Sequence, residues 1–142
     1  MTETMTELST TVSRFIPAPR DRVFDAWLDP DMLARFMIAG DGMSVPSVSV
    51  DPKVGGRFEI LMRGEKDYPH AGTFREIDRP DRLVFTWESE WDAPGSTVTV
   101  TFKEADGGTQ VELHQVRFPD EDNRDNHTAG WTCVLETLAT VF

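Results

Sequence analysis

Residues 97–116 read TVTVTFKEADGGTQVELHQV and hold two alternating segments around Asp106-Gly107-Gly108. Alternation of apolar with polar side chains on both sides of an Asp-Gly turn is a strong signal for a β-hairpin. We therefore predict paired strands at 97–104 and 109–118. One face of this pair is rich in threonine and can meet water, whereas the other is apolar and needs a covering element. The apolar face consists of Val98, Val100, Phe102, Val111 and Leu113.

The segment after the hairpin has the period of a helix. Trp131, Val134, Leu135 and Leu138 are spaced i, i+3, i+4 and i+7, which places them on one helical face. The acidic run at 120–122 suits the start of this helix, where unpaired backbone N–H groups concentrate partial positive charge. These features predict a long C-terminal helix that covers the apolar face of the sheet.

The residues before the hairpin predict a first strand, two short helices and four further strands. Asp29 is the expected cap of the second helix, and Pro46 places its strand at an edge or a bulge. The fold class is thus α+β, with a curved antiparallel sheet of about seven strands wrapped on a long C-terminal helix and two short helices after the first strand. The expected elements are 10–16 (strand), 19–27 and 31–36 (helices), and 43–50, 56–63, 73–78 and 82–88 (strands).

Length and charge restrict the class of protein. The chain has 142 residues, which suits one domain, placed at 9–142 after a flexible N-terminus at 1–8. Its formal net charge is −11, and the basic residues are scattered among acids, which disfavours nucleic acid and anionic membranes as partners. No stretch approaches the ~20 apolar residues of a membrane-spanning helix, and no signal-peptide pattern opens the chain. We expect a cytoplasmic protein that is monomeric or a weak homodimer.

The residues that commonly carry chemistry form no recognisable catalytic or metal-binding pattern. His70, His114 and His127 are far apart and have no metal-ligand spacing, although they could converge in space. Cys133 lies within the predicted last helix, where a free cysteine packs as a small hydrophobe. Glu88 follows an inward-facing tryptophan on its strand, so alternation directs it outward. We expect no catalytic residue, no metal and no cofactor.

Gly130 lies directly before Trp131 in the predicted last helix. A glycine inside a helix costs about 0.5–1 kcal/mol relative to alanine. One interpretation places Gly130 in a fraying first turn, where it has no role. The other, which we favour, is that the helix backbone touches the sheet or lines a cavity there, so that a side chain would intrude.

Several motifs with a common order and spacing extend over about 9–142. They are RF at 14–15, APRDRVFDAWLDP at 18–30, DPKVGGRF at 51–58, GTFREI at 72–77, LVFTW at 83–87, GT at 108–109, His127, and GW at 130–131. Together they resemble the bacterial proteins related to the C-terminal domain of the Hsp90 ATPase activator. That family is part of the helix-grip superfamily, with START lipid carriers, plant pathogenesis-related proteins and polyketide cyclases. The resemblance implies a seven-stranded helix-grip fold and, commonly, an apolar cavity between the sheet and the long helix.

Three functions remain open. The leading one is a non-catalytic binding domain that encloses an apolar small molecule, lipid-like or aromatic, in that cavity. The alternative is a protein-binding module of the Hsp90-activator type, with a chaperone or another protein as partner. The third is a polyketide cyclase-like enzyme, which would need polar groups along the cavity for acid–base chemistry. The expected cavity residues are Trp27, Phe36, Phe58, Ile60, Met62, Phe74, Phe85, Trp87, Leu113, Gln115, Gly130, Trp131 and Leu135.

Overall fold

The computed structural model describes residues 8–142, in which the chain forms seven strands and three helices. Residues 1–7 of the predicted flexible N-terminus lie outside the described residues. In chain order the elements are β1 (Ser9–Ile16), α1 (Arg20–Ala26), α2 (Pro30–Phe36), β2 (Ser44–Val50), β3 (Arg57–Arg63), β4 (Asp67–Asp78), β5 (Arg82–Thr86), β6 (Thr97–Ala105), β7 (Gly108–Val116) and α3 (Glu121–Thr140).

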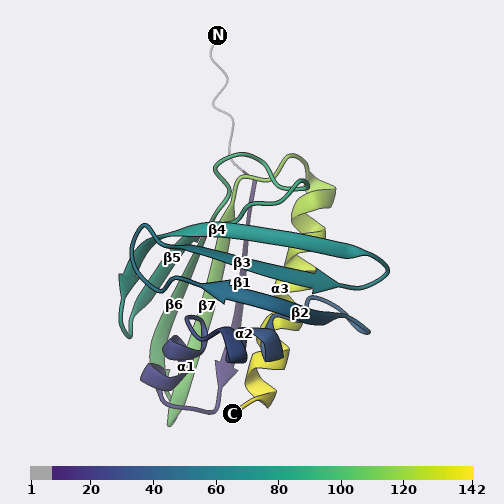
Figure 1. Ribbon diagram of the computed structural model, residues 1–142. Helices are drawn as coiled ribbons and strands as arrows, with labels where there is room; N and C mark the ends of the chain where they lie inside the picture. The colour runs from purple at the N-terminus through teal and green to yellow at the C-terminus, as the bar shows by residue number, and fades with distance from the viewer. Residues whose placement is uncertain (1–7) are drawn as a thin grey trace.

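The strands form one antiparallel sheet in the order β1-β7-β6-β5-β4-β3-β2. Figure 1 shows the sheet curving around α3, with β2–β4 running across the direction of β1, β6 and β7. Helix α3 packs against β1, and α2 packs against both β2 and α3. The predicted α+β helix-grip fold is therefore confirmed, including the two short helices after the first strand.

The β6–β7 hairpin closes through a two-residue turn at Asp106 and Gly107. Their φ angles are 46° and 80°. Positive φ at both central residues is the geometry of a type I′ turn, whose twist matches that of the flanking strands. The turn fixes the register of the hairpin, so all of its predicted apolar residues face the core and are buried.

Strand β4 is longer than the sequence prediction of 73–78 and begins at Asp67. This extension contains Pro69, and proline removes a ladder hydrogen bond from a strand. The structure accommodates Pro69 because β3 pairs with the first half of β4, whereas β5 pairs only with the second half, so one side of the strand is open there. The extension places Tyr68 and His70 on the concave side of the sheet, in register with β3.

The predicted edge position of Pro46, the Asp29 cap and the acidic start of the last helix are confirmed. Pro46 lies on the edge strand β2, at the bulge where its register with β3 shifts. The carboxylate of Asp29 accepts a hydrogen bond from the backbone N–H of Asp31 at 2.9 Å and caps α2. Asp120 caps α3 in the same way, by accepting from the N–H of Asn123 at 2.8 Å.

The core fills the space between the concave face of the sheet and the helices, and aromatic rings make up much of it. The ring of Phe58 lies 5.3 Å from that of Phe85 and 5.4 Å from that of Phe74, between centroids. On the other side of the molecule, Phe24 packs edge-on against Phe102 at 5.1 Å. Such pairs add roughly 0.5–1.5 kcal/mol each to the energy of burial.

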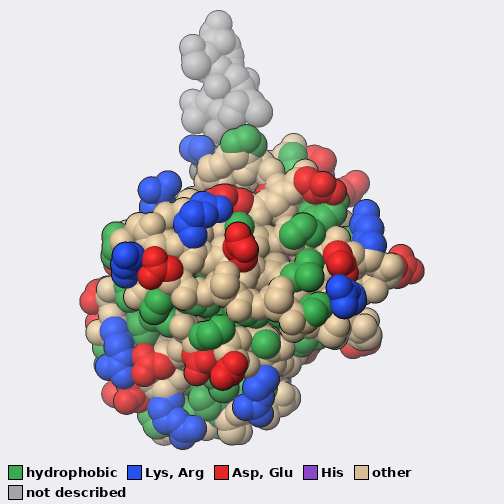
Figure 2. Space-filling view, in the orientation of Figure 1, with side chains coloured by type: hydrophobic (Ala, Val, Ile, Leu, Met, Phe, Trp, Pro, Cys, Tyr) green, Lys and Arg blue, Asp and Glu red, His purple; other side chains and the backbone are tan. Residues whose placement is uncertain are grey.

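Basic and acidic side chains lie close together over the face shown in Figure 2. The protein has several exposed ion pairs, such as the one between Arg57 and Glu88 at 3.1 Å. Glu88 thus points outward, as alternation predicted. Exposed pairs of this kind contribute little to stability, about 0–1 kcal/mol each. Within residues 8–142 no helix is both long and apolar enough to cross a membrane.

Candidate ligand-binding pocket

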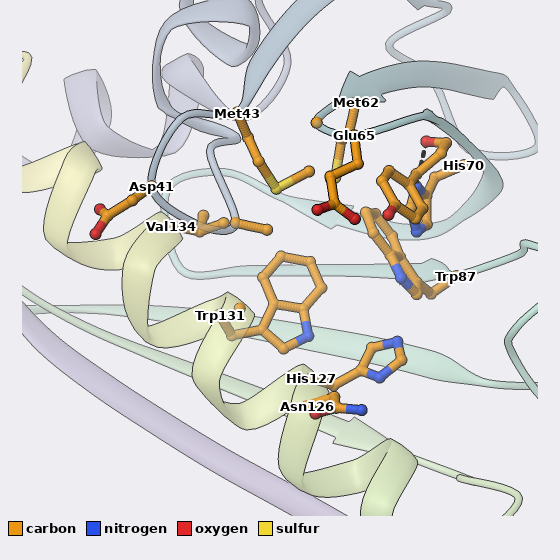
Figure 3. Close-up of a pocket in the computed structure, with 14 residues that line it drawn as sticks. Asp41, Met43, Met62, Glu65, His70, Trp87, Asn126, His127, Trp131 and Val134 are labelled. Atoms are coloured by element: carbon orange, nitrogen blue, oxygen red, sulfur yellow. Dashed lines mark hydrogen bonds between the residues drawn. The ribbon is translucent and has the colours of Figure 1, made fainter.

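A partly open pocket of about 480 Å³ lies between α3 and the sheet. Its walls come from the middle of α3, the ends of β3 and β4 with the turn between them, the segment after β5, and the loop between α2 and β2 (Figure 3). The indole rings of Trp87 and Trp131 meet at a centroid distance of 4.9 Å and form its apolar floor. The apolar lining consists of Ala39, Met43, Met62, Trp87, Gly130, Trp131 and Val134.

Trp131 is held in place by a buried hydrogen-bond chain. Its indole N–H donates to Oε1 of Gln115 on β7 at 2.6 Å. The amide nitrogen of Gln115 donates in turn to the hydroxyl of Ser96 at 2.7 Å, and Gln115 has no exposed surface. A buried amide with both ends paired is rigid, because any rotation would leave polar atoms without partners. The orientation of the Trp131 ring is therefore fixed before any ligand arrives.

One end of the pocket is polar and includes His127. Its Nε2 lies 2.8 Å from Oδ1 of Asp92, and its Nδ1 lies 2.8 Å from the backbone oxygen of Asn123. Both partners are acceptors, so the protonated ring, with an N–H on each nitrogen, fits this geometry best. Burial of the ring disfavours its charge, but the hydrogen bonds and the negative charge of Asp92 outweigh this and raise the pKa of His127.

His70 lies in the same part of the pocket, but its pKa is shifted in the opposite direction. Its Nδ1 donates to the backbone oxygen of Tyr68 at 2.9 Å (Figure 3). Burial lowers the pKa of His70, and this effect exceeds the opposing influence of the Tyr68 carbonyl and of Asp92. The ring is therefore neutral at pH 7. With Nδ1 protonated, its Nε2 carries a lone pair and is a hydrogen-bond acceptor.

The mouth of the pocket carries two exposed acids, Asp41 and Glu65. The ammonium group of Lys66 lies beside the mouth, 5.6 Å from the ring centroids of both Tyr68 and Trp91, and is not part of the lining. Two carboxylates against one ammonium, on a chain with a net charge of −11, disfavour the entry of anions.

A sequence profile described as Activator of Hsp90 ATPase homolog 1-like protein matches residues 17–142. The chain belongs to this AHSA1-like family. No functionally curated protein matches the chain. The family and the helix-grip fold support a ligand-binding or activator-type domain in general terms.

Solved structures share the AHSA1-like fold over nearly the whole chain. A solution structure of an AHSA1-like protein from Aeromonas hydrophila is 28% identical, with a TM-score of 0.80, over 93% of this chain and 90% of that one. CalU16 from Micromonospora echinospora is 26% identical, with a TM-score of 0.73, over 93% and 74%. Protein CV1439 from Chromobacterium violaceum has a TM-score of 0.85 at 23% identity over 94% and 95%, which shows the fold alone.

Within this AHSA1-like fold, four of the residues predicted to line a cavity face the pocket, namely Met62, Trp87, Gly130 and Trp131. The free volume between Trp27, Phe58 and their neighbours is only about 10 Å³, enough for about one water molecule. The remaining predicted residues are buried outside the pocket lining: Trp27, Phe36, Phe58, Ile60, Phe74, Phe85, Leu113, Gln115 and Leu135. Gly130 lies in the middle of α3, so the first-turn interpretation is wrong. The favoured interpretation is right that the helix lines a cavity there, but wrong on a contact with the sheet, because among residues 8–142 a Cβ at Gly130 would meet only Ala39 of the α2–β2 loop, at an ordinary 3.5 Å.

Sequence reasoning missed the polar end of the pocket. His70 was missed because the predicted strand began only at residue 73, although Tyr68, His70 and Gly72 continue the alternation that leads to the buried Phe74. His127 was part of a family motif, but its partner Asp92 lies in the segment between β5 and β6, which has no periodic pattern. The two residues are 35 positions apart in the sequence, and no local pattern predicts their contact.

Proposed function

We propose that the chain is a non-catalytic binding domain that holds an apolar, aromatic small molecule in this pocket. The observation that carries the proposal is the volume of about 480 Å³ together with the walls of tryptophan, methionine and valine. Ligand sites typically have about 300–1,000 Å³, are mostly apolar and contain a few polar groups. The pocket has this composition, with His70 and His127 at one end.

The two indole rings favour a flat ligand. Trp87 and Trp131 are both 3% exposed, so packing from behind holds each ring rigid while one part of it faces the pocket. Aromatic pairs gain about 0.5–1.5 kcal/mol beyond the burial of their area. A preformed wall also lowers the entropy lost on binding, because the side chains are already ordered.

Another hollow, of about 610 Å³, lies beside the β6–β7 turn and does not have these properties. It is lined by charged side chains such as Arg20, Asp21 and Glu104 and by turn residues, and contains no aromatic ring. An apolar ligand would gain little binding free energy there, because the hollow offers little apolar surface for the ligand to cover. The proposal therefore concerns the pocket between α3 and the sheet.

A titration with the neutral fluorophore N-phenyl-1-naphthylamine tests the proposal. We expect saturable, one-to-one binding with a blue-shifted emission. Phe15 and Val54 are the large exposed apolar side chains of residues 8–142, at 40% and 62% exposure, and are the obvious places for unspecific adsorption. The double variant Phe15→Ser, Val54→Ser is therefore the control and should bind as the wild type does. Weak, non-saturable binding that falls in this variant would reject the proposal and favour the activator-type alternative.

A further inference from the structure

The indole N–H of Trp87 has no hydrogen-bond partner among residues 8–142. The ring is 3% exposed, and its nitrogen is shielded from water. A buried donor without a partner costs roughly 1–3 kcal/mol. Trp131, the other indole of the pocket floor, is paired with Gln115, so of these two pocket tryptophans Trp87 is the one whose donor is unused. A ligand oxygen that reaches this N–H, after a small side-chain adjustment, gains a hydrogen bond without displacing bound water.

His70 supplies an acceptor next to this donor. Its ring lies 4.9 Å from that of Trp87 between centroids, at an interplanar angle of 30°. Nδ1 is engaged with the Tyr68 carbonyl, whereas Nε2 has no partner among the described residues and is not one of their shielded atoms. In Figure 3 the nitrogen of Trp87 and the free nitrogen of His70 lie at the same end of the pocket, above His127. At this end of the pocket, a donor just beneath the surface and an acceptor that is not shielded thus lie side by side.

The charges around this end favour a neutral group. His127 lies 2.8 Å from the carboxylate of Asp92, which balances the charge of the protonated ring, and its Nδ1 lies 2.8 Å from the backbone oxygen of Asn123. A carboxylate on the ligand would therefore find no free cationic donor in the lining, would face the lone pair of His70, and would pass Asp41 and Glu65 at the mouth. A hydroxyl carries no charge and both accepts and donates, which matches the Trp87 donor and the His70 acceptor.

We propose that the pocket binds a neutral hydroxylated aromatic compound, whose hydroxyl oxygen accepts from Nε1 of Trp87 and whose hydroxyl hydrogen is donated to Nε2 of His70. The ring system lies against Trp131 and the methionines Met43 and Met62. This inference rests on the proposed function, because it specifies the polar group of the ligand at the same site. It also divides the pocket into an apolar body and a polar end with separate contributions to affinity.

Four probes with the same ring system separate these contributions when titrated calorimetrically into the full chain. 2-Naphthol carries a donor and an acceptor, 2-methoxynaphthalene an acceptor only, naphthalene neither, and 2-naphthoate a negative charge. We expect 2-naphthol to bind about tenfold more tightly than naphthalene, the ratio given by one to two net hydrogen bonds. The methoxy compound should bind between them, and 2-naphthoate no more tightly than naphthalene.

Equal affinity of naphthalene and 2-naphthol would overturn the hydroxyl subsite and leave the proposed function standing. Tighter binding of 2-naphthoate would overturn the neutral character of the subsite. The absence of binding by all four probes would overturn the proposed function itself, and the inference with it. The failures of the two proposals are thus distinguishable.

Two matched variants locate the donor. Trp87→Phe removes the N–H at the pocket and should abolish the preference for 2-naphthol over naphthalene. Trp27 is the control, because its indole N–H is also buried and unpartnered but lies outside the pocket lining. Trp27→Phe should keep the preference. His70→Leu should reduce it to the level of the methoxy compound.

A readout on the wild type covers the case in which Trp87→Phe does not fold. In ¹⁵N spectra the indole N–H resonance of Trp87 should shift downfield with 2-naphthol and much less with naphthalene, whereas that of Trp27 should stay in place with both. An unmoved Trp87 resonance in the presence of saturating 2-naphthol would overturn the assignment of the donor.

Discussion

Trp131 on α3 donates its indole N–H to Oε1 of Gln115 on β7 across 2.6 Å, in the interior of the protein. This bond joins the long helix to the sheet at the floor of the pocket. The nitrogen of the same amide donates to Ser96, so the buried side chain of Gln115 holds the Trp131 wall of the pocket in position. The rigidity of the candidate site therefore originates outside its lining.

Gln115→Leu should destabilise the fold by about 1–3 kcal/mol, because it leaves the Trp131 N–H and the Ser96 hydroxyl without partners in the interior. The freed indole should also weaken the binding of an apolar probe several-fold. Urea unfolding and probe titration measure the two effects. Gln110→Leu is the matched control on the same strand, because the Gln110 side chain has no hydrogen bond within residues 8–142. Equal unfolding midpoints for the two variants would contradict this account.

The sequence predicted the features that depend on local periodicity. The alternation in β6 and β7 is enough to predict this hairpin and its buried face. The helical spacing of Trp131, Leu135 and Leu138 predicts the last helix and the side of it that packs against the sheet. The same alternation directs Gln115 inward at the end of its strand, where the structure finds it buried. These inferences succeed because the core side of each element follows from its own residues.

The position of the pocket did not follow from periodicity, because a void depends on how far elements stand apart. Phe58, Phe74 and Phe85 have the same inward pattern as Met62, yet they fill the core solidly while Met62 lines the pocket. The difference arises at the ends of β3 and β4, where the α2–β2 loop lies opposite α3 and the two leave space between them. No pattern within a single strand contains that information.

The Asp92–His127 pair predicts a pH dependence of stability with a definite sign. The pKa of His127 is raised in the folded protein, above an ordinary value of about 6.5. The stabilisation from this pair is therefore fully present below pH ~6.5 and is lost as the pH rises through the folded pKa. The difference in unfolding free energy between the wild type and Asp92→Asn should be largest near pH 6 and should shrink toward pH 9.

His70 also titrates in this experiment. Burial lowers the pKa of His70, so its protonation favours the unfolded state and stability falls as the pH drops through ~6.5. Asp92 partly opposes this lowering, so Asp92→Asn lowers the pKa of His70 further and adds to the difference at low pH with the same sign. Histidine NMR titrations should place His127 above and His70 below the ordinary value. A His127 that titrates at or below it would show that the ion pair does not form in solution.

The cap of α3 gives a second stability test. Asp120 accepts from the backbone N–H of Asn123, which otherwise has no partner inside the helix. Asp120→Ala should lower the free energy of unfolding by about 0.5–2 kcal/mol. Asp122→Ala removes a carboxylate of the same first turn that is not the cap, and should have a smaller effect. Thermal melts of the two variants at one pH make the comparison.

The last prediction concerns Gly130, which lines the pocket from the middle of α3. A Cβ at this position would lie 3.5 Å from Cβ of Ala39, in ordinary van der Waals contact. Gly130→Ala should therefore fit and raise the free energy of unfolding by about 0.5–1 kcal/mol through helix propensity.

A larger side chain at the same position has no such room. Gly130→Leu must extend into the pocket or press against Ala39, and overpacking of that kind costs about 1–3 kcal/mol. The leucine should thus displace N-phenyl-1-naphthylamine, whereas the alanine should retain most of the binding. Melting temperatures and probe titrations on both variants separate helix propensity from occupation of the pocket. A Gly130→Leu protein that melts higher than the wild type and binds the probe unchanged would show that the ligand site lies elsewhere.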